Sequence, residues 1–250
     1  MVQTVLAWDK LAASLQIELA RRDVNAFCEF VFRDSANRPW RQQSFHREWQ
    51  ALLPVEGPAR VLIGAPRESA KSSQMAVARV LWELGRNPEL RVKIVSATED
   101  LAGNLVAEIQ RHIERNPRLQ LVFPHLRPNP AGPWTRGVLL VERRGIAKDA
   151  TVTAHGVLSS AVGSRADLII FDDVCDFRNA VQQAATRAQV KDAFSEIWVN
   201  LLGPTGRAVY VATVWHEHDL TMELKGHPEW LKWWRPARDE VTKEPLWPGR

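Results

Sequence analysis

Residues 61–72 read VLIGAPRESAKS, an apolar run followed by a short polar turn and by Lys71-Ser72 at the start of a helical stretch. A strand that leads through a turn into a helix N-terminus presents backbone N–H groups to an anion, because those groups have no partner within the helix. In a phosphate-binding loop, the lysine contacts the β- and γ-phosphates and the next hydroxyl ligates Mg²⁺. The stretch therefore predicts either a divergent nucleotide site or a strand–turn–helix that arose by chance.

The match to the pattern G-x-x-x-x-G-K-[ST] is imperfect, because alanine stands at both glycine positions and Gly64 comes one residue too early. Glycine reaches left-handed backbone angles without steric cost, whereas alanine does not. We therefore expect a loop that cradles phosphate without glycine-only angles at its two alanines. The eight positions of the loop are Ala65, Pro66, Arg67, Glu68, Ser69, Ala70, Lys71 and Ser72.

The composition of the chain sets limits on its class. With 250 residues and 45% hydrophobic content, the chain is long enough for one large α/β domain, or for a domain with a small appendage. The net charge of +4 is compatible with a nucleic-acid partner but does not require one. Cys28 and Cys175 lack the spacing of a metal site, which favours buried thiols in a reducing compartment. The N-terminus lacks the features of a signal peptide, so we expect a cytosolic chain.

The periodicity of apolar residues predicts strands that alternate with helices. Two amphipathic helices are expected within 5–32, broken near Arg22-Asp23, and the proline-rich 117–136 is expected to be an excursion rather than part of the core. This alternation predicts a mainly parallel central sheet with helices on both faces. The expected strands are 59–64, 91–98, 137–144, 150–157, 167–174, 207–214 and 231–237, and the expected helices are 46–53, 72–84, 99–115, 180–201 and one that ends at 226.

Tryptophan is unusually frequent, with eleven residues against one tyrosine, and three of them cluster at 230–234. The cluster favours packing in the core or at an interface, and stacking on a base is the alternative.

A buried acidic strand supplies the expected partner of the loop. The sequence LIIFDD ends in Asp172 and Asp173, as does the strand that holds the Mg²⁺ shell in phosphate-loop enzymes. Asp172 would hold the metal, and Asp173 would polarise the water that attacks the γ-phosphate. Glutamate is commoner at that second position, and aspartate is one methylene shorter. The alternative is an acidic strand end that caps the next helix.

Two arginines are candidates for offsetting charge in the transition state. Arg67, inside the loop, would reach the γ-phosphate of its own chain, or would be a surface charge. Arg165 precedes the acidic strand and would act in trans as an arginine finger within a ring, or would form a salt bridge with Asp167.

A third strand ends in VATVWHEHDL. Thr213 at its tip would sense the γ-phosphate. The His216-Glu217-His218-Asp219 run lacks the spacing of a zinc helix, and Glu217 or Asp219 favours a capping role at a helix N-terminus.

The ordered set PRESAKS, SRADLIIFDD and ATVWHEHDL resembles the large terminase subunit of tailed bacteriophages, the DNA-packaging ATPase, over residues 25–250. The segment RPWRQQSFHREWQALL resembles the part of that family before its phosphate loop. The resemblance implies a P-loop NTPase fold of the RecA/ASCE type, with ATP and Mg²⁺ as cofactors. It implies that Lys71 and Ser72 bind phosphate and metal, that Asp172 binds Mg²⁺, that Asp173 is catalytic, that Thr213 couples hydrolysis to movement, and that Gln42 or Gln43 contacts adenine.

The resemblance also implies an organisation and a set of partners. We expect a helical lid region at 1–55, an ATPase core at 56–240, and at 241–250 the start of a linker to a nuclease domain that lies outside this chain, so that no nuclease activity is expected here. The implied partners are double-stranded DNA, the portal protein, the small terminase subunit and further copies in a ring, expected to be a pentamer, with a monomer in solution. The implied location is the host cytoplasm. A helicase-like or other DNA-remodelling ATPase, and a non-hydrolysing nucleotide-dependent DNA-binding module, are the alternatives.

Overall fold

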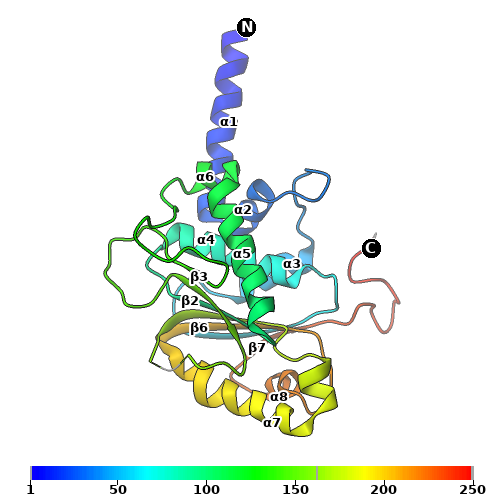
Figure 1. Ribbon diagram of the computed structural model, residues 1–250. Coiled ribbons are helices and arrows are strands. Elements are labelled where there is room, and N and C mark those ends of the chain that lie inside the picture. Colours follow the sequence, from blue (N-terminus) through cyan, green and yellow to red (C-terminus); the bar gives the residue numbers. More distant parts are fainter. Residues whose placement is uncertain (1, 162, 249–250) are drawn as a thin grey trace.

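The computed structural model describes residues 2–161 and 163–248 as an α/β fold built on one sheet (Figure 1). Within these ranges, seven strands pair in the order β3-β4-β2-β5-β6-β1-β7. All neighbours are parallel except β3, which runs antiparallel to β4. The prediction of a mainly parallel sheet is therefore confirmed. The strands are β1 Ala59–Gly64, β2 Val92–Ser96, β3 Val138–Leu139, β4 Val152–Gly156, β5 Ala166–Asp172, β6 Leu202–Ala212 and β7 Leu231–Trp234.

Helices cover both faces of the sheet, because the central strands are apolar on both sides. In β5, Leu168 and Ile170 enter one buried cluster, whereas Ile169 and Phe171 enter the other. The first cluster lies under α2 Val24–Val31, α3 Ser44–Leu52, η1 Ser73–Ala78, α4 Arg79–Arg86 and α5 Glu99–Arg115. The second lies against η2 Phe177–Gln182, α7 Ala184–Ala193, η3 Phe194–Trp198, η4 Val199–Leu201 and α8 Leu220–Gly226. Figure 1 shows α7 and α8 on the opposite side of the sheet from α3, α4 and α5.

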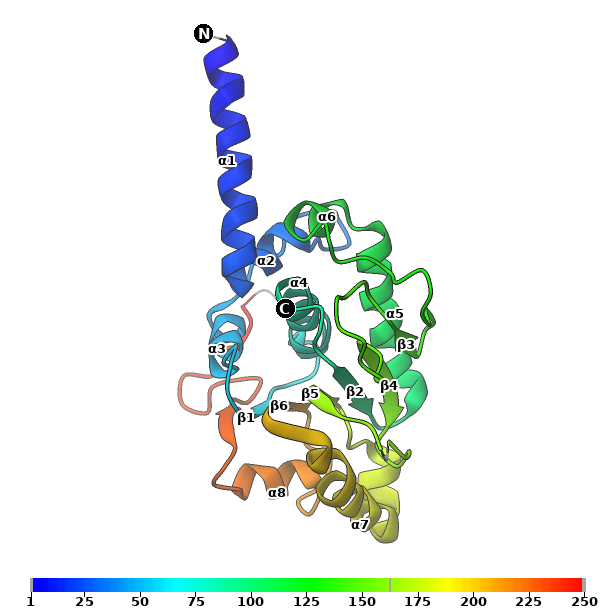
Figure 2. The same ribbon diagram turned by 90° about the vertical axis from the view of Figure 1, so that its left-hand side faces the viewer.

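One long helix stands apart from these layers. α1 Val2–Arg22 projects away from the sheet in both views (Figures 1 and 2). Its C-terminal end is fixed to the domain, because Arg21 Nε donates to the Val122 carbonyl at 2.7 Å. Asp23 then ends α1 and caps α2 through a hydrogen bond from the Ala26 N–H, as the predicted break at 22–23 requires. Among the described residues, no helix is long and apolar enough to cross a bilayer.

The expectation of an excursion rather than core over 117–136 is wrong in its first part, where α6 Pro117–Val122 forms and Leu119 and Val122 are buried in the first cluster. Asn116 accepts hydrogen bonds from the Arg118 and Leu119 N–H groups, and Pro117 occupies the first turn. Asn-Pro therefore ends α5 and also begins a new helix, because proline is well suited to the first helical position. The predicted strand pair at 137–144 and 150–157 forms, but β3 is only two residues long.

A buried charge network joins α3, α4 and β6. The Arg79 guanidinium donates to the Leu53 carbonyl and to Glu83, and Arg207 forms a second ion pair with the same Glu83 at 2.7 Å. All three side chains are buried. A buried ion pair is expensive to desolvate, so each of its polar atoms must be bonded, and here the carbonyls of residues 53 and 54 complete the set.

The C-terminal tryptophans pack within the domain. Trp230 and Trp233 are 6% exposed, which confirms the packing role favoured for the cluster. Trp247 contacts Phe45 and His46, with ring centroids 5.7 and 5.0 Å apart. The predicted linker at 241–250 thus folds back on α3 as far as the structure describes it; residues 249–250, and residue 1 of the predicted lid region, lie outside the described residues. The proposed boundaries at 56 and 241 stay predictions.

Gly64 has a structural reason to be glycine. A Cβ built at this position would lie 2.1 Å from the Trp234 ring, which β7 packs against β1. We expect Gly64→Ala to lower the free energy of unfolding by about 1–3 kcal/mol, because the indole must shift. Urea denaturation measures this loss, with Gly203→Ala as the control, since a Cβ there meets nothing within 4 Å. Equal stability of the two variants would contradict the close approach.

Candidate nucleotide site

The candidate site lies at the carboxyl edge of three adjacent parallel strands. β1 leads into the 65–70 loop, β5 ends at Asp172, and β6 ends one residue before Thr213. Because β6 pairs with both β1 and β5, the three strand ends meet at one edge of the sheet. Ligands of open α/β sheets bind at this edge.

Lys71 is the central charge of this edge. Its side chain is 7% exposed, and its Nζ donates to Thr213 Oγ1 at 3.0 Å. Asp173 Oδ2 lies 3.4 Å from the same nitrogen, and Asp173 Oδ1 accepts the Thr213 N–H at 3.1 Å. The structure thus brings together three residues that the sequence predicted for the site from three different segments.

Ser72 and Asp172 form the second polar pair of the site. Ser72 Oγ donates to Asp172 Oδ2 at 3.0 Å, whereas the buried Oδ1 of Asp172 has no hydrogen-bond partner among the described residues. Burial, and then repulsion from Asp173, raise the pKa of Asp172 to about 7. A hydroxyl beside an under-coordinated carboxylate is the kind of oxygen pair that Mg²⁺ prefers, so these residues fit the metal implied by the resemblance.

The backbone of the loop differs from the expectation. Ala70 has φ of 62° and Glu68 also has φ of 62°, so the loop does adopt a left-handed angle at the second alanine of the motif. The expectation of a loop without such angles at its alanines is wrong for Ala70. The angle points the backbone into the helix that begins at Lys71, and the cost to a residue with a Cβ is about 1–2 kcal/mol.

Residues at the start of α3 hold the 65–70 loop in place through hydrogen bonds. His46 Nε2 lies 2.9 Å from the Ser69 carbonyl, and His46 Nδ1 accepts the Gln43 N–H at 3.2 Å, so Nε2 carries the proton. Ser69 Oγ in turn donates to the Pro66 carbonyl at 2.7 Å. The role of His46 was missed by sequence reasoning, although it lies within the RPWRQQSFHREWQALL segment that carries part of the resemblance.

Two clefts meet at Ala70 and Ser73. One, of about 450 Å³, is lined by the loop, Lys71, Asp173, Thr213 and Trp215. The other, of about 980 Å³, lies beside α3 and is lined by Gln43, His46, Trp40, Gln74 and Trp247, among others. Gln43 faces this second cleft, whereas Gln42 is buried and donates to Gln74 Oε1. Of the two residues expected on the adenine side, Gln43 thus lines the cleft, and a contact with adenine stays a prediction.

Arg67 and Arg165 occupy very different positions. Arg67 lines the smaller cleft, and its guanidinium lies 4.5 Å from the Trp215 ring centroid. Arg165 precedes the amino end of β5, and the seven residues of that strand, about 20 Å long, separate it from Asp172. It therefore lies outside the site of its own chain, and a role in trans stays a prediction. The alternative ion pair with Asp167 is wrong, because Asp167 pairs with Arg91 at 2.7 Å.

The HEHD run at 216–219 contributes a cap. Asp219 Oδ1 accepts the Met222 N–H at the start of α8, and Oδ2 accepts the Trp215 and His216 N–H groups. The capping role is thereby confirmed for Asp219, and these bonds also fix Trp215 at the mouth of the smaller cleft.

No family model matches the chain. The large terminase subunit of Enterobacteria phage T3 is 32% identical over 157 residues, which are 61% of this chain and 25% of that protein. The crystal structure of the HK97 bacteriophage large terminase superposes with a TM-score of 0.59 at 14% identity, over 88% of this chain and 45% of that one. The chain has the fold of a large terminase ATPase domain.

A second solved structure agrees with this fold. The large terminase ATPase domain of Thermus phage P74-26 superposes with a TM-score of 0.51 at 18% identity, over 79% of this chain and 82% of that domain. The resemblance to phage large terminases is therefore confirmed, together with the P-loop fold. The chain spans about a quarter of the T3 terminase subunit and less than half of the HK97 terminase.

Ala70→Gly tests the left-handed loop residue. We expect this variant to raise the free energy of unfolding by about 0.5–1 kcal/mol, because glycine adopts a φ of 62° without a Cβ clash. Ala65→Gly is the matched control and should lower stability, since Ala65 is buried and is not among the described residues with positive φ. Thermal unfolding of the free protein measures both changes, and destabilisation by Ala70→Gly would contradict the assigned backbone.

Asp172→Asn tests the buried carboxyl. Its folded-state pKa of about 7 exceeds its ordinary value of 3.8, so the folded state binds the proton more tightly and stability falls as pH rises through that window. We expect the variant to gain on the order of 2 kcal/mol relative to the wild type between pH 5 and pH 8, as measured by urea unfolding in EDTA. The exposed Asp192→Asn is the control, and a stability difference that does not vary with pH would contradict the shift.

Proposed function

We propose that this chain hydrolyses ATP and is the ATPase part of a phage large terminase, which drives double-stranded DNA into a procapsid. The observation that carries the proposal is the constellation at one sheet edge, where Lys71, Thr213 and Asp173 contact one another beside the Ser72–Asp172 pair. The sequence identity of 32% with the T3 terminase subunit, over 157 residues, supports the same assignment.

The residues have separate roles in this proposal. The γ-phosphate would become a partner of Lys71 in addition to Thr213 and Asp173, and the buried ammonium has a strong electrostatic effect there. Asp173 is 42% exposed, so that its carboxylate reaches solvent and orients the attacking water. Ser72 and Asp172 hold Mg²⁺, which when bound supplies positive charge to the β- and γ-phosphates.

The two clefts accommodate the rest of the nucleotide. The triphosphate occupies the smaller cleft, and the base occupies the larger one beside Gln43. Arg67 leaves the Trp215 ring to contact the γ-phosphate, which is a movement that a single long side chain can make without a change of backbone. Arg165 of a neighbouring subunit would complete the site only in a ring.

Double-stranded DNA is the polymer that the motor is proposed to move. It is bound through its phosphates, because a packaging motor moves along any sequence. The portal protein, the small terminase subunit and a ring of copies are proposed partners, and the host cytoplasm is the proposed location. The alternatives are another DNA-remodelling ATPase and a non-hydrolysing nucleotide-dependent module.

Mg²⁺-dependent release of phosphate from ATP tests the proposal. We expect Lys71→Ala and Asp173→Asn to reduce the rate about 10²-fold or more, because each removes a group that acts on the transition state. Lys148→Ala, an exposed lysine outside both clefts, should leave the rate unchanged.

The assay is run with and without duplex DNA, and nucleotide binding is measured in parallel. A wild-type rate no higher than that of the two site variants, despite bound nucleotide, would overturn hydrolysis and favour the non-hydrolysing module. Hydrolysis without any effect of DNA would favour an ATPase with another substrate.

A further inference from the structure

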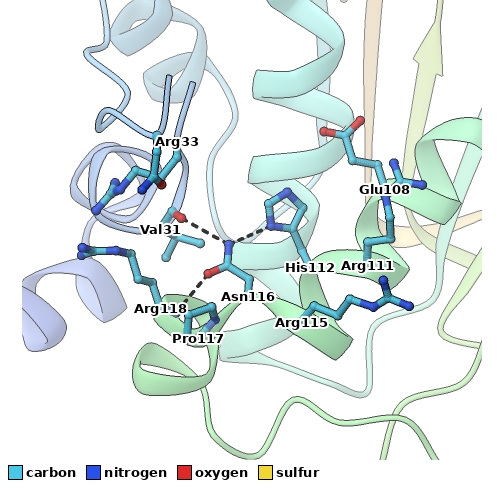
Figure 3. A pocket seen from close by; sticks show the side chains of 10 residues that line it. Val31, Arg33, Glu108, Arg111, His112, Arg115, Asn116, Pro117 and Arg118 are labelled. Atoms are coloured by element: carbon cyan, nitrogen blue, oxygen red, sulfur yellow. Dashed lines mark hydrogen bonds between the residues drawn. The ribbon is translucent and has the colours of Figure 1, made fainter. Parts of the chain in front are cut away.

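A third polar hollow adjoins the larger of the two clefts, with which it shares Arg33. It has a volume of about 370 Å³ and lies where the C-terminal ends of α2 and α5 meet the start of α6 (Figure 3). Four arginines line it against one carboxylate, that of Glu108. We call it the arginine pocket; its lining arginines are Arg33, Arg111, Arg115 and Arg118.

Arg33 bonds carbonyls at the end of α2 and Arg115 lies in the last turn of α5, yet the four arginines also repel one another. Arg111 and Arg115 lie one helical turn apart on α5, an arrangement in which like charges destabilise a helix. Burial, and then the nearby Arg118, lower the pKa of Arg33. Figure 3 shows Arg33 and Arg118 on one side of His112 and Asn116, and Arg111 and Arg115 on the other. Each repulsion costs stability in the free protein, and an anion bound beside a pair would offset the repulsion within that pair.

The ion pairs of the pocket leave most of this charge uncompensated. Arg115 Nε approaches Glu114 only to 3.9 Å, and its side chain is 79% exposed. Arg118 lies over the Phe30 ring at 5.3 Å rather than against an acid. Burial raises the pKa of Glu108, against the opposing effect of Arg111, and Glu108 is the one carboxylate in the lining. The pocket therefore presents several guanidinium groups to solvent.

The walls of the pocket are fixed before any ligand arrives. Asn116 Nδ2 donates to the Val31 carbonyl and to His112 Nδ1, and its Oδ1 accepts from the start of α6 (Figure 3). One side chain thus ties α2, α5 and α6 together. Burial and the adjacent Arg111 lower the pKa of His112 to about 4, so the imidazole is neutral at pH 7 and acts as a wall rather than as a charge.

We propose that the arginine pocket, which adjoins the larger cleft at Arg33, is a phosphate-binding site that takes the backbone of duplex DNA. A guanidinium group can donate two parallel hydrogen bonds to the oxygens of one phosphate. Several arginines that line one hollow therefore suit a phosphodiester backbone better than they suit carboxylates at irregular positions. The affinity for phosphate follows from the pocket itself, whereas DNA as its source rests on the proposed function.

Binding of a labelled 30-base-pair duplex, measured by fluorescence anisotropy over a range of salt concentrations, tests the proposal. Arg111→Gln/Arg115→Gln should weaken binding about tenfold and reduce the slope of log affinity against log salt by about 1–2, because each lost phosphate contact removes about 0.9 from that slope. Arg33 is kept, since its guanidinium donates to the carbonyls of residues 29 and 32 and supports the end of α2.

Arg127→Gln/Arg144→Gln is the control with the same change of charge outside the pocket. An equal loss of affinity in both double variants would overturn the proposal, because net charge alone would then explain it. Unchanged DNA binding by the pocket variant would overturn it as well. If the protein hydrolyses ATP in that case, the proposed function stands although the pocket proposal fails. Circular dichroism and thermal unfolding confirm that each variant is folded.

A second probe separates the pocket from its source of phosphate. Pyrophosphate binding is measured by calorimetry in a Lys71→Ala background, so that the nucleotide site does not contribute. Binding that is lost on Arg111→Gln/Arg115→Gln supports the phosphate site. If pyrophosphate binds in this way but the wild type has no affinity for DNA, DNA is overturned as the ligand and the result counts against the proposed function. If pyrophosphate does not bind and the pocket variant binds DNA as the wild type does, the site itself is overturned.

Discussion

The buried ammonium of Lys71 is the interaction on which the arrangement of the sheet edge depends. A lysine that is 7% exposed needs partners, and it takes them from the ends of β5 and β6, through Asp173 and Thr213. These partners are within reach because the strand that leads to Thr213 lies between the strand of the loop and the strand of the acids. Any exchange of those strands would leave the charge without its neighbours, at a cost of several kcal/mol.

The same edge is held from behind by polar contacts that fix the loop and its helix. His46 supports the loop at the Ser69 carbonyl, and the Gln42–Gln74 hydrogen bond joins the α3 segment to the helix that follows Lys71. Deeper in the domain, Arg79 ties the same helix to the end of α3. The loop is thereby set in place by residues that contact no phosphate, and its left-handed alanine is tolerated because its surroundings determine the backbone.

The sequence was sufficient for features that arise from local patterns. The helix over 99–115 and the buried strand that ends at Asp172 were predicted to within a residue or two, because periodicity, a Thr98 cap and a run of apolar residues determine them. The left-handed Ala70 was not predictable, since its angle is set by packing rather than by residue type. The contact of Trp247 with His46 joins segments 200 residues apart and leaves no periodic trace in the chain. Arg165 was expected to act in trans, and the direction of β5 places it at the end of that strand opposite to Asp172, so that role stays a prediction.

The position of α5 has one more consequence. The helix contributes Leu101 to the wall of the smaller cleft, and Arg111 and Arg115 to the arginine pocket. At 1.5 Å per residue, about 15–20 Å of continuous hydrogen-bonded backbone joins the two hollows. A hydrogen-bonded helix of this length is a stiff element, so the backbone of α5 holds the two hollows at a fixed spacing.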